Sequence, residues 1–94
     1  MNSVDKKILY LIDLLIFNNK IDNVRQFCKK IGMLEQTISK IKKGASHFTV
    51  KHIKSIGEVY NVNINWIFDI EEVIYLKNVG VQKVYKSKEL IQKS

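Results

Sequence analysis

The stretch that decides the fold is Val24–Gly44, which reads VRQFCKKIGMLEQTISKIKKG. Within it, Phe27 and Ile31 stand four residues apart and form one apolar stripe, and Gly32 follows where a left-handed turn residue is needed. A second stripe recurs at i, i+4 and i+7, on Leu34, Ile38 and Ile41. The spacing predicts two short helices locked around a tight turn, which is a helix-turn-helix.

Two helices this short cannot bury enough apolar surface alone, so other segments must cover them. The sequence before them predicts a helix from Val4 to Phe17, capped by Ser3. Its core stripe is Ile8, Leu11, Ile12 and Leu15. Further apolar residues exceed one face, and we expect them to meet the C-terminal tail or a second subunit; they are Leu9, Tyr10, Leu14 and Ile16.

Polar residues mark the starts of the later helices. Asn23, followed three residues later by Gln26, has the spacing of a capping box, and the next helix runs from Leu34 to Lys42 and closes at Gly44. Thr49 begins a fourth helix, whose expected inward residues are Val50, Ile53, Ile56 and Tyr60. Asn63 begins a short fifth helix, which carries the core residues Trp66 and Ile67.

The tail after the fifth helix gives a mixed pattern. Ile70, Val73 and Ile74 suggest another helical turn or two, whereas Val79, Val81 and Val84 suit a strand equally well. Its apolar content favours a packing or dimerisation role over a solvated extension. We therefore expect a domain at 1–68 followed by a C-terminal extension at 69–94.

Four segments together resemble the Cro and phage-repressor type of DNA-binding domain, over about Lys20 to Phe68. They are FCKKIG (27–32), EQTISKIKKG (35–44), TVKHIKSIGEVY (49–60) and NVNINWIF (61–68), the last with a tryptophan that is buried in that family. The resemblance implies an all-α, five-helix repressor-like bundle that contains the helix-turn-helix and binds double-stranded DNA.

The net charge of +7 is placed unevenly along the chain. Basic and acidic residues balance within 1–19 and again within 55–94, so the whole excess lies between Lys20 and Lys54. Lysine outnumbers arginine, and Ile and Asn are abundant, as an AT-rich genome would also produce. That bias would be spread evenly, whereas this excess coincides with the motif and has the form of an electrostatic footprint for DNA.

Several other classes of protein are disfavoured by composition. Cys28, the only cysteine, excludes an internal disulfide and is interpreted as core filler, which fits a cytoplasmic protein. The apolar run Ile8 to Phe17 is interrupted by Asp13 and is shorter than the ~20 residues of a membrane span, so neither a signal peptide nor a membrane partner is expected. His47, His52 and Cys28 fit no metal-ligand spacing, and we expect no metal, no cofactor and no enzymatic activity.

The candidate site follows from the second helix of the motif. With Ile38 inward and about 100° of rotation per residue, Gln36, Ser39, Lys40 and Lys43 point outward. The resemblance implies that this helix enters the major groove and that its base-contacting positions fall early in the helix. The expected base-contacting residues are Glu35, Gln36, Thr37, Ser39 and Lys40, and the expected phosphate-contacting residues are Asn23, Arg25, Lys43, Ser46 and His47.

Three residues depart from the family's pattern. Val24 stands where a glutamine often grips a phosphate, and Leu34 stands where a serine or threonine usually caps the recognition helix. Glu35 brings a negative charge toward the DNA backbone unless it accepts a hydrogen bond from a cytosine amine. These departures affect the contacts expected at the site more than the fold.

We therefore expect a sequence-specific transcriptional regulator, most simply a repressor, that acts as a homodimer in a bacterial or phage cytoplasm. One alternative is the antitoxin of a toxin–antitoxin pair, in which the C-terminal tail binds a protein partner. The other is a protein-interaction module that kept the fold and lost DNA binding. Steep loss of binding with salt is expected for the DNA readers and not for an apolar interface.

Overall fold

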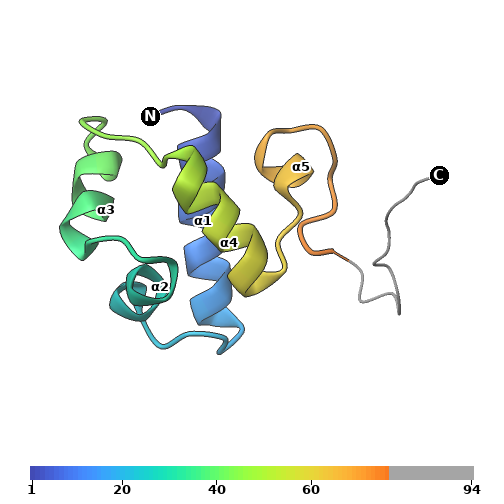
Figure 1. Ribbon diagram of the computed structural model, residues 1–94, viewed down its shortest axis with the longest axis horizontal. Helices are drawn as coiled ribbons and strands as arrows, with labels where there is room; N and C mark the ends of the chain where they lie inside the picture. Colours follow the sequence, from blue (N-terminus) through green and yellow to red (C-terminus); the bar gives the residue numbers. More distant parts are fainter. Residues whose placement is uncertain (77–94) are drawn as a thin grey trace.

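Five helices, four of them begun by a polar capping side chain, make up the computed structural model, which describes residues 1–76. Their bounds are α1 Ser3–Phe17, α2 Val24–Ile31, α3 Glu35–Lys42, α4 Val50–Tyr60 and α5 Ile64–Ile67. In Figure 1, α1 and α4 form the centre, α2 and α3 lie to one side, and α5 lies on the other. The predicted all-α class with five helices is confirmed.

The helix starts are close to those predicted from the capping residues. Asn23 Oδ1 accepts from the Gln26 backbone N–H at 2.9 Å, and Thr49 forms a full capping box with His52. The start of α1 was assigned to the wrong residue, because the cap is Asn2, whose Oδ1 accepts from the Asp5 N–H at 2.8 Å. Asn and Ser cap helices equally well, so the sequence alone does not distinguish Asn2 from Ser3 as the cap.

The core contains every residue of the predicted α1 stripe. Ile8 and Leu11 are wholly buried, with Ile12 and Leu15 nearly so, and they pack with Phe27, Ile31, Ile38, Ile41, Ile53, Ile56, Trp66 and Ile67 from the other helices. Fully burying one such side chain contributes about 1.5–3 kcal/mol. The helical spacing of apolar residues therefore identified most of the surface that holds the bundle together.

Two apolar residues predicted to face inward are instead exposed. Val50 is 81% exposed and Leu34 is 66% exposed. Val50 is the first residue of α4, on the flank of its stripe and beyond the edge of the core. Leu34 precedes α3 with an extended backbone (φ −83°, ψ 138°), so the helical rotation that placed it beside Ile38 does not apply. Both errors fall at helix ends, where helical periodicity stops being a guide to burial.

The segment after α5 forms turns and then an isolated bridge, so the further helical turn predicted over Ile70, Val73 and Ile74 is absent. The Asn63 N–H donates to the Ile74 carbonyl at 2.8 Å, and the Leu76 N–H donates to the Asn61 carbonyl at 3.0 Å. These bonds flank an isolated antiparallel bridge between Val62 and Tyr75. Ile74 and Tyr75 pack against the core, whereas the possible strand at Val79, Val81 and Val84 lies outside the described residues.

A cluster of polar contacts fastens α1 to the end of α5. Lys7 Nζ donates to the Trp66 carbonyl at 2.9 Å, pairs with Asp69 Oδ1 at 2.6 Å and lies 4.8 Å from the centroid of the Trp66 ring. Ser3 Oγ donates to Asp69 Oδ2 at 2.7 Å. The hydrogen bond from Lys7, and after it the one from Ser3, lowers the pKa of Asp69.

None of the helices in residues 1–76 is both long and apolar enough to cross a membrane.

Candidate nucleic-acid interface

The turn between α2 and α3 has the geometry that the sequence predicts. Gly32 adopts a left-handed conformation (φ 74°, ψ 37°), and the Met33 N–H donates to the Cys28 carbonyl at 2.9 Å, which closes the end of α2. A side chain at Gly32 would meet open space, so the backbone conformation alone favours glycine there. Figure 1 shows α2 nearly end-on and α3 lengthwise, so the two helices cross steeply, as in a helix-turn-helix.

Helix α2 is the support on which α3 rests. Its residues Phe27, Cys28 and Ile31 are buried, and the Phe27 ring stacks on Tyr60 of α4 with centroids 5.5 Å apart and planes 8° apart. Burial raises the pKa of the Cys28 thiol, and the Glu35 carboxylate raises it further. The thiol is therefore held neutral, as expected for a residue that fills the core.

Helix α3 has one buried face and one exposed face. Ile38 and Ile41 are buried, and the side chains predicted to point outward, Gln36, Ser39, Lys40 and Lys43, are exposed. Thr37 is half-buried on the flank, and Glu35 is exposed at the start of the helix. Within residues 1–76, the side chains of Gln36, Ser39 and Lys40 make no hydrogen bond to protein, which leaves their polar groups free for an external ligand.

The negative charge of Glu35 is partly offset by Arg25 of α2. Arg25 Nε lies 3.5 Å from Glu35 Oε1, and the two side chains are 82% and 54% exposed. An exposed pair at this distance stabilises the fold by little, about 0–1 kcal/mol. Its local effect is on the interface, because the guanidinium offsets the carboxylate that would otherwise repel a phosphate.

The first turn of α3 has no side-chain cap. Leu34 occupies the cap position and offers no acceptor, so the backbone N–H groups of Glu35 and Gln36 have no partner inside the helix. Such N–H groups, at the positive end of the helix dipole, donate readily to an anion. The sequence identified Leu34 as a departure from the family's pattern but placed it in the core.

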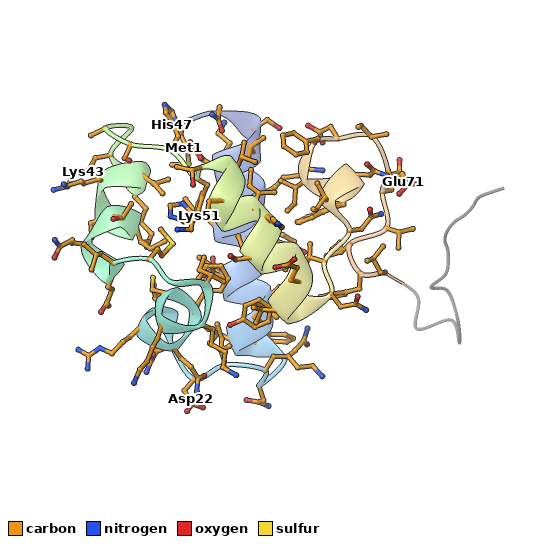
Figure 2. All side chains as sticks on the ribbon, in the orientation of Figure 1. Met1, Asp22, Lys43, His47, Lys51 and Glu71 are labelled. Carbon is orange, nitrogen blue, oxygen red and sulfur yellow. The ribbon has the colours of Figure 1, made fainter. Side chains whose placement is uncertain are left out.

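The residues expected to contact phosphates come from both sides of α3. Lys43 and His47 lie at one edge of the molecule, on the segment that joins α3 to α4 (Figure 2). Asn23 uses its oxygen as the cap of α2, so only its amide nitrogen is left to donate outward. Ser46 is half-buried beside His47. The expected phosphate group is therefore exposed in part, with Asn23 and Ser46 restricted by their local structure.

His47 is held by a residue that the sequence reasoning did not identify as part of the site. Its Nδ1 lies 2.6 Å from Oδ2 of Asp5, whose side chain is wholly buried, and Asp5 Oδ1 accepts from the Phe48 N–H at 3.0 Å. A carboxylate only accepts, so Nδ1 carries the proton, and the contact of Asn2 Nδ2 with the same nitrogen at 3.4 Å is not a hydrogen bond. Any phosphate contact of the ring then comes through Nε2.

A signal for Asp5 was present in the sequence. Asp5 lies three residues before Ile8 and therefore on the buried stripe of α1, where a carboxylate requires donors. The donors come from residues 47 and 48, far along the chain, so the sequence alone did not identify them. Their contact fixes the segment that follows α3 against the start of α1.

The positive charge of the chain is concentrated in the segment that contains this site. The remaining cations between residues 20 and 54 are all exposed, and they are Lys20, Lys29, Lys30, Lys42, Lys51 and Lys54. Residues 55–76 contain four acidic side chains and no Lys or Arg. Lys43 and Glu71 lie at opposite ends of the molecule in Figure 2.

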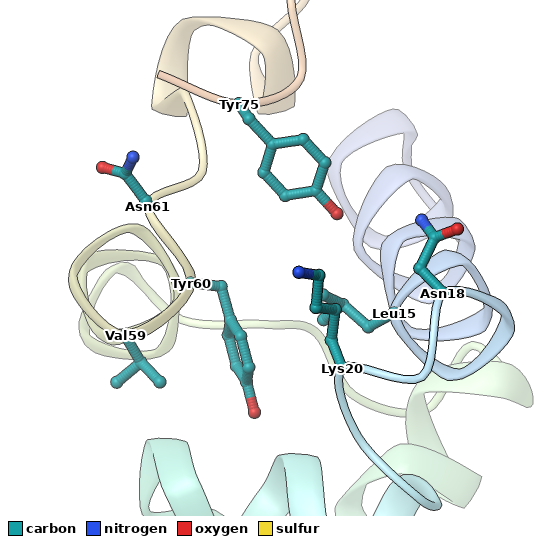
Figure 3. A pocket seen from close by; sticks show the side chains of 7 residues that line it. All are labelled: Leu15, Asn18, Lys20, Val59, Tyr60, Asn61 and Tyr75. Carbon is teal, nitrogen blue, oxygen red and sulfur yellow. The ribbon is translucent and has the colours of Figure 1, made fainter. Parts of the chain in front are cut away.

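A cleft of about 470 Å³ lies away from α3, where the C-terminal ends of α1 and α4 converge (Figure 3). Leu15, Val59 and Tyr60 line it, and the ammonium of Lys20 points into it. The carbonyl ends of two helices favour a cation, and Lys20 supplies one. None of the predicted base- or phosphate-contacting residues lines this cleft.

Metal-ligating side chains do not gather in the described structure. Within residues 1–76, no three residues of the types His, Cys, Asp or Glu are close enough to hold a metal ion.

Comparison of the chain with protein-family models, with curated proteins and with solved structures finds no match.

Proposed function

We propose that this protein is a sequence-specific double-stranded DNA-binding transcriptional regulator, acting as a repressor, that reads the major groove with α3. The observation that carries the proposal is the two-sided character of α3. Ile38 and Ile41 anchor it in the core, while Gln36 and Lys40 stand exposed with no protein hydrogen-bond partner in residues 1–76. A short helix fixed by its neighbours and presenting such a face suits a groove about 12 Å wide.

Each exposed side chain has a base edge that matches its chemistry. The amide of Gln36 can pair with N6 and N7 of adenine, and the ammonium of Lys40 can donate to O6 and N7 of guanine. The methyl group of Thr37 suits a thymine methyl, and the hydroxyl of Ser39 can donate or accept. Glu35, with its charge offset by Arg25, would accept from a cytosine amine.

Affinity and register would come from contacts to the phosphate backbone. Lys43, Ser46 and the Nε2 atom of His47 lie after α3, while Arg25 and the amide nitrogen of Asn23 lie on the side of α2. Glu71 lies at the other end of the molecule from Lys43, so attraction between DNA and the lysine-rich segment would turn α3 toward DNA during encounter.

We further propose that the regulator acts as a homodimer. One recognition helix of eight residues reads only a few base pairs, and two copies raise both affinity and specificity when their helices meet half-sites about 34 Å apart. The expected operator is then a palindrome with half-sites one turn of DNA apart. Analytical ultracentrifugation with and without the selected duplex measures the stoichiometry.

A second candidate is a protein-interaction module that has lost DNA binding. The observation in its favour is the exposed, uncapped Leu34 at the leading end of α3, which would suit an apolar partner. This candidate predicts an interface whose strength is nearly independent of salt, in contrast to DNA binding.

Selection of bound duplexes from a random pool tests the proposal. We expect an enriched palindrome, and we expect log K for that duplex to fall linearly with log salt, with a slope near −0.9 for each phosphate contacted. A scrambled duplex of the same composition is the control and should show only weak, salt-sensitive binding. Failure to enrich any sequence, with no salt-sensitive binding to either duplex, would rule out DNA reading and leave the interaction module.

A further inference from the structure

Leu34 occupies a costly position for a leucine. It is 66% exposed, and it stands at the cap of α3, where Ser, Thr, Asp or Asn would accept a hydrogen bond from a backbone N–H of the first turn. A leucine there loses that hydrogen bond and leaves an apolar side chain in water. No contact within residues 1–76 offsets either loss, since Leu34 is outside both the buried core and the partly buried residues packed against it.

The position of Leu34 is also the one that would come closest to DNA. A recognition helix enters the major groove with its N-terminal residues nearest the base edges. Leu34 directly precedes Glu35 and Gln36, and the half-buried Thr37 lies one turn along the same end of α3. The only apolar group that base edges display in the major groove is the C5-methyl of thymine.

We infer that Leu34 is a specificity-determining residue that reads thymine by packing its side chain against the C5-methyl group. The inference rests on the proposed function, which it deepens by naming a group that the site recognises. It differs from the polar contacts of Gln36 and Lys40, because it distinguishes thymine from uracil, whose hydrogen-bonding groups are the same.

The test uses the full chain and the duplex selected from the random pool. Each thymine in turn is replaced by uracil, which removes one methyl group and keeps the base pair. We expect one thymine in each half-site, distinct from any that the Thr37 methyl contacts, at which uracil weakens binding about fourfold, the worth of one buried methyl group. Leu34→Ala should bind the thymine duplex more weakly and show no further loss with uracil, so that the double-mutant cycle gives a coupling between side chain and methyl.

Two further variants separate base reading from folding. Leu34→Ser restores a capping acceptor, so it should raise the thermal unfolding midpoint while losing the discrimination between thymine and uracil. Leu76→Ala removes another exposed leucine, whose N–H donates to the carbonyl of Asn61 beyond the end of α4, and should keep the discrimination. Improved stability together with lost base reading cannot be explained by misfolding.

Four outcomes overturn the inference. If uracil has no effect at any position, no residue reads a thymine methyl. If the uracil penalty is equal for the wild type and both Leu34 variants, a residue other than Leu34 reads it. In both cases the proposal of DNA binding is unaffected. A change of oligomeric state in Leu34→Ser without a change in discrimination would place Leu34 between copies of the chain. If no duplex binds at all, the proposed function and this inference fail together.

Discussion

Asp5 and His47 are 42 residues apart in the chain, and their side chains meet at 2.6 Å, Oδ2 to Nδ1. The carboxylate is wholly buried and its other oxygen accepts from the Phe48 N–H, whereas the imidazole is more than half exposed. A buried charge on α1 therefore sets the path of the chain as it leaves α3. Residues expected to hold phosphates depend on it for their position.

Replacing Asp5 with Ala should destabilise the protein by about 1–3 kcal/mol, because the buried Phe48 N–H is left without an acceptor. Urea unfolding measures the change. Asp13→Ala is the matched control, since Asp13 is an exposed aspartate on the same helix, and it should leave the unfolding free energy within about 0.5 kcal/mol of the wild type. Equal stability of the two variants would show that the carboxylate of Asp5 does not hold this segment.

Gln36 and Lys43 should differ in what their loss does to DNA binding. Gln36→Ala should relax the preference at one base pair at a cost of about 1–3 kcal/mol, because a base contact is lost. Lys43→Ala should weaken all sequences alike and reduce the salt slope by about 1, because a phosphate contact is lost. Repeating the random-pool selection with each variant distinguishes the two effects. An unaltered preference for Gln36→Ala would mean that this contact is misassigned.

Acidification should loosen the start of α4 through His52. Its Nδ1 accepts from the Thr49 N–H at 3.1 Å, which requires the neutral ring. Burial, and after it the nearby Lys51, lowers the pKa of His52 below its ordinary value of 6.5. The unfolded chain therefore binds the proton more readily, so this contribution to stability is complete above about pH 6.5 and is lost as the pH falls from there through the folded-state pKa.

The matched variant for that pH dependence is His52→Gln, because glutamine at the same position completes a capping box and does not titrate. We expect His52→Gln to unfold with a flatter pH dependence between pH 5 and pH 7, as measured by urea titration across that range. An NMR titration should place the pKa of His52 below 6.5. A pKa above 6.5 would contradict the cap as described.

The hydroxyl of Tyr60 is buried and has no hydrogen-bond partner within the described residues. Burial, and after it the neighbouring Cys28, raises the pKa of this phenol. Tyr60→Phe keeps the stack on Phe27 and removes the unpaired hydroxyl, so it should stabilise the fold by about 1 kcal/mol in urea unfolding. Tyr10→Phe, at an exposed tyrosine, should change little. A loss of stability in Tyr60→Phe would reveal a hydrogen bond to that hydroxyl.

Most of the fold could be predicted because its determinants are local. The spacing of Phe27 and Ile31, the left-handed Gly32 and the caps at Asn23 and Thr49 each act within a few residues, and each was read from the sequence. The errors occurred where that locality ends. Leu34 lies at a helix boundary, where rotation about the helix axis no longer places a side chain, and its exposure could not be inferred from spacing.

The parts that could not be predicted depend on partners distant in sequence. The extended segment at Ile74 and Tyr75 takes its hydrogen bonds from the backbone at residues 61–63, and its apolar residues suit a helix as well as a strand. The pairing of Asp5 with residues 47 and 48 likewise depends on the folded path of the chain. In the candidate site, exposure of the predicted α3 face followed from periodicity, whereas the orientation of His47 did not.

Because Cys28 is buried, the rate at which its thiol is alkylated measures how often the structure around it opens. A neutral thiol packed beneath the turn of the helix-turn-helix cannot react with an alkylating reagent until α2 moves away from α1 and α4. The rate of alkylation in native buffer therefore measures the population of this open state, and no engineered cysteine is needed. A DNA duplex that binds α3 should slow the reaction in proportion to its occupancy, since bound DNA stabilises the closed state by mass action.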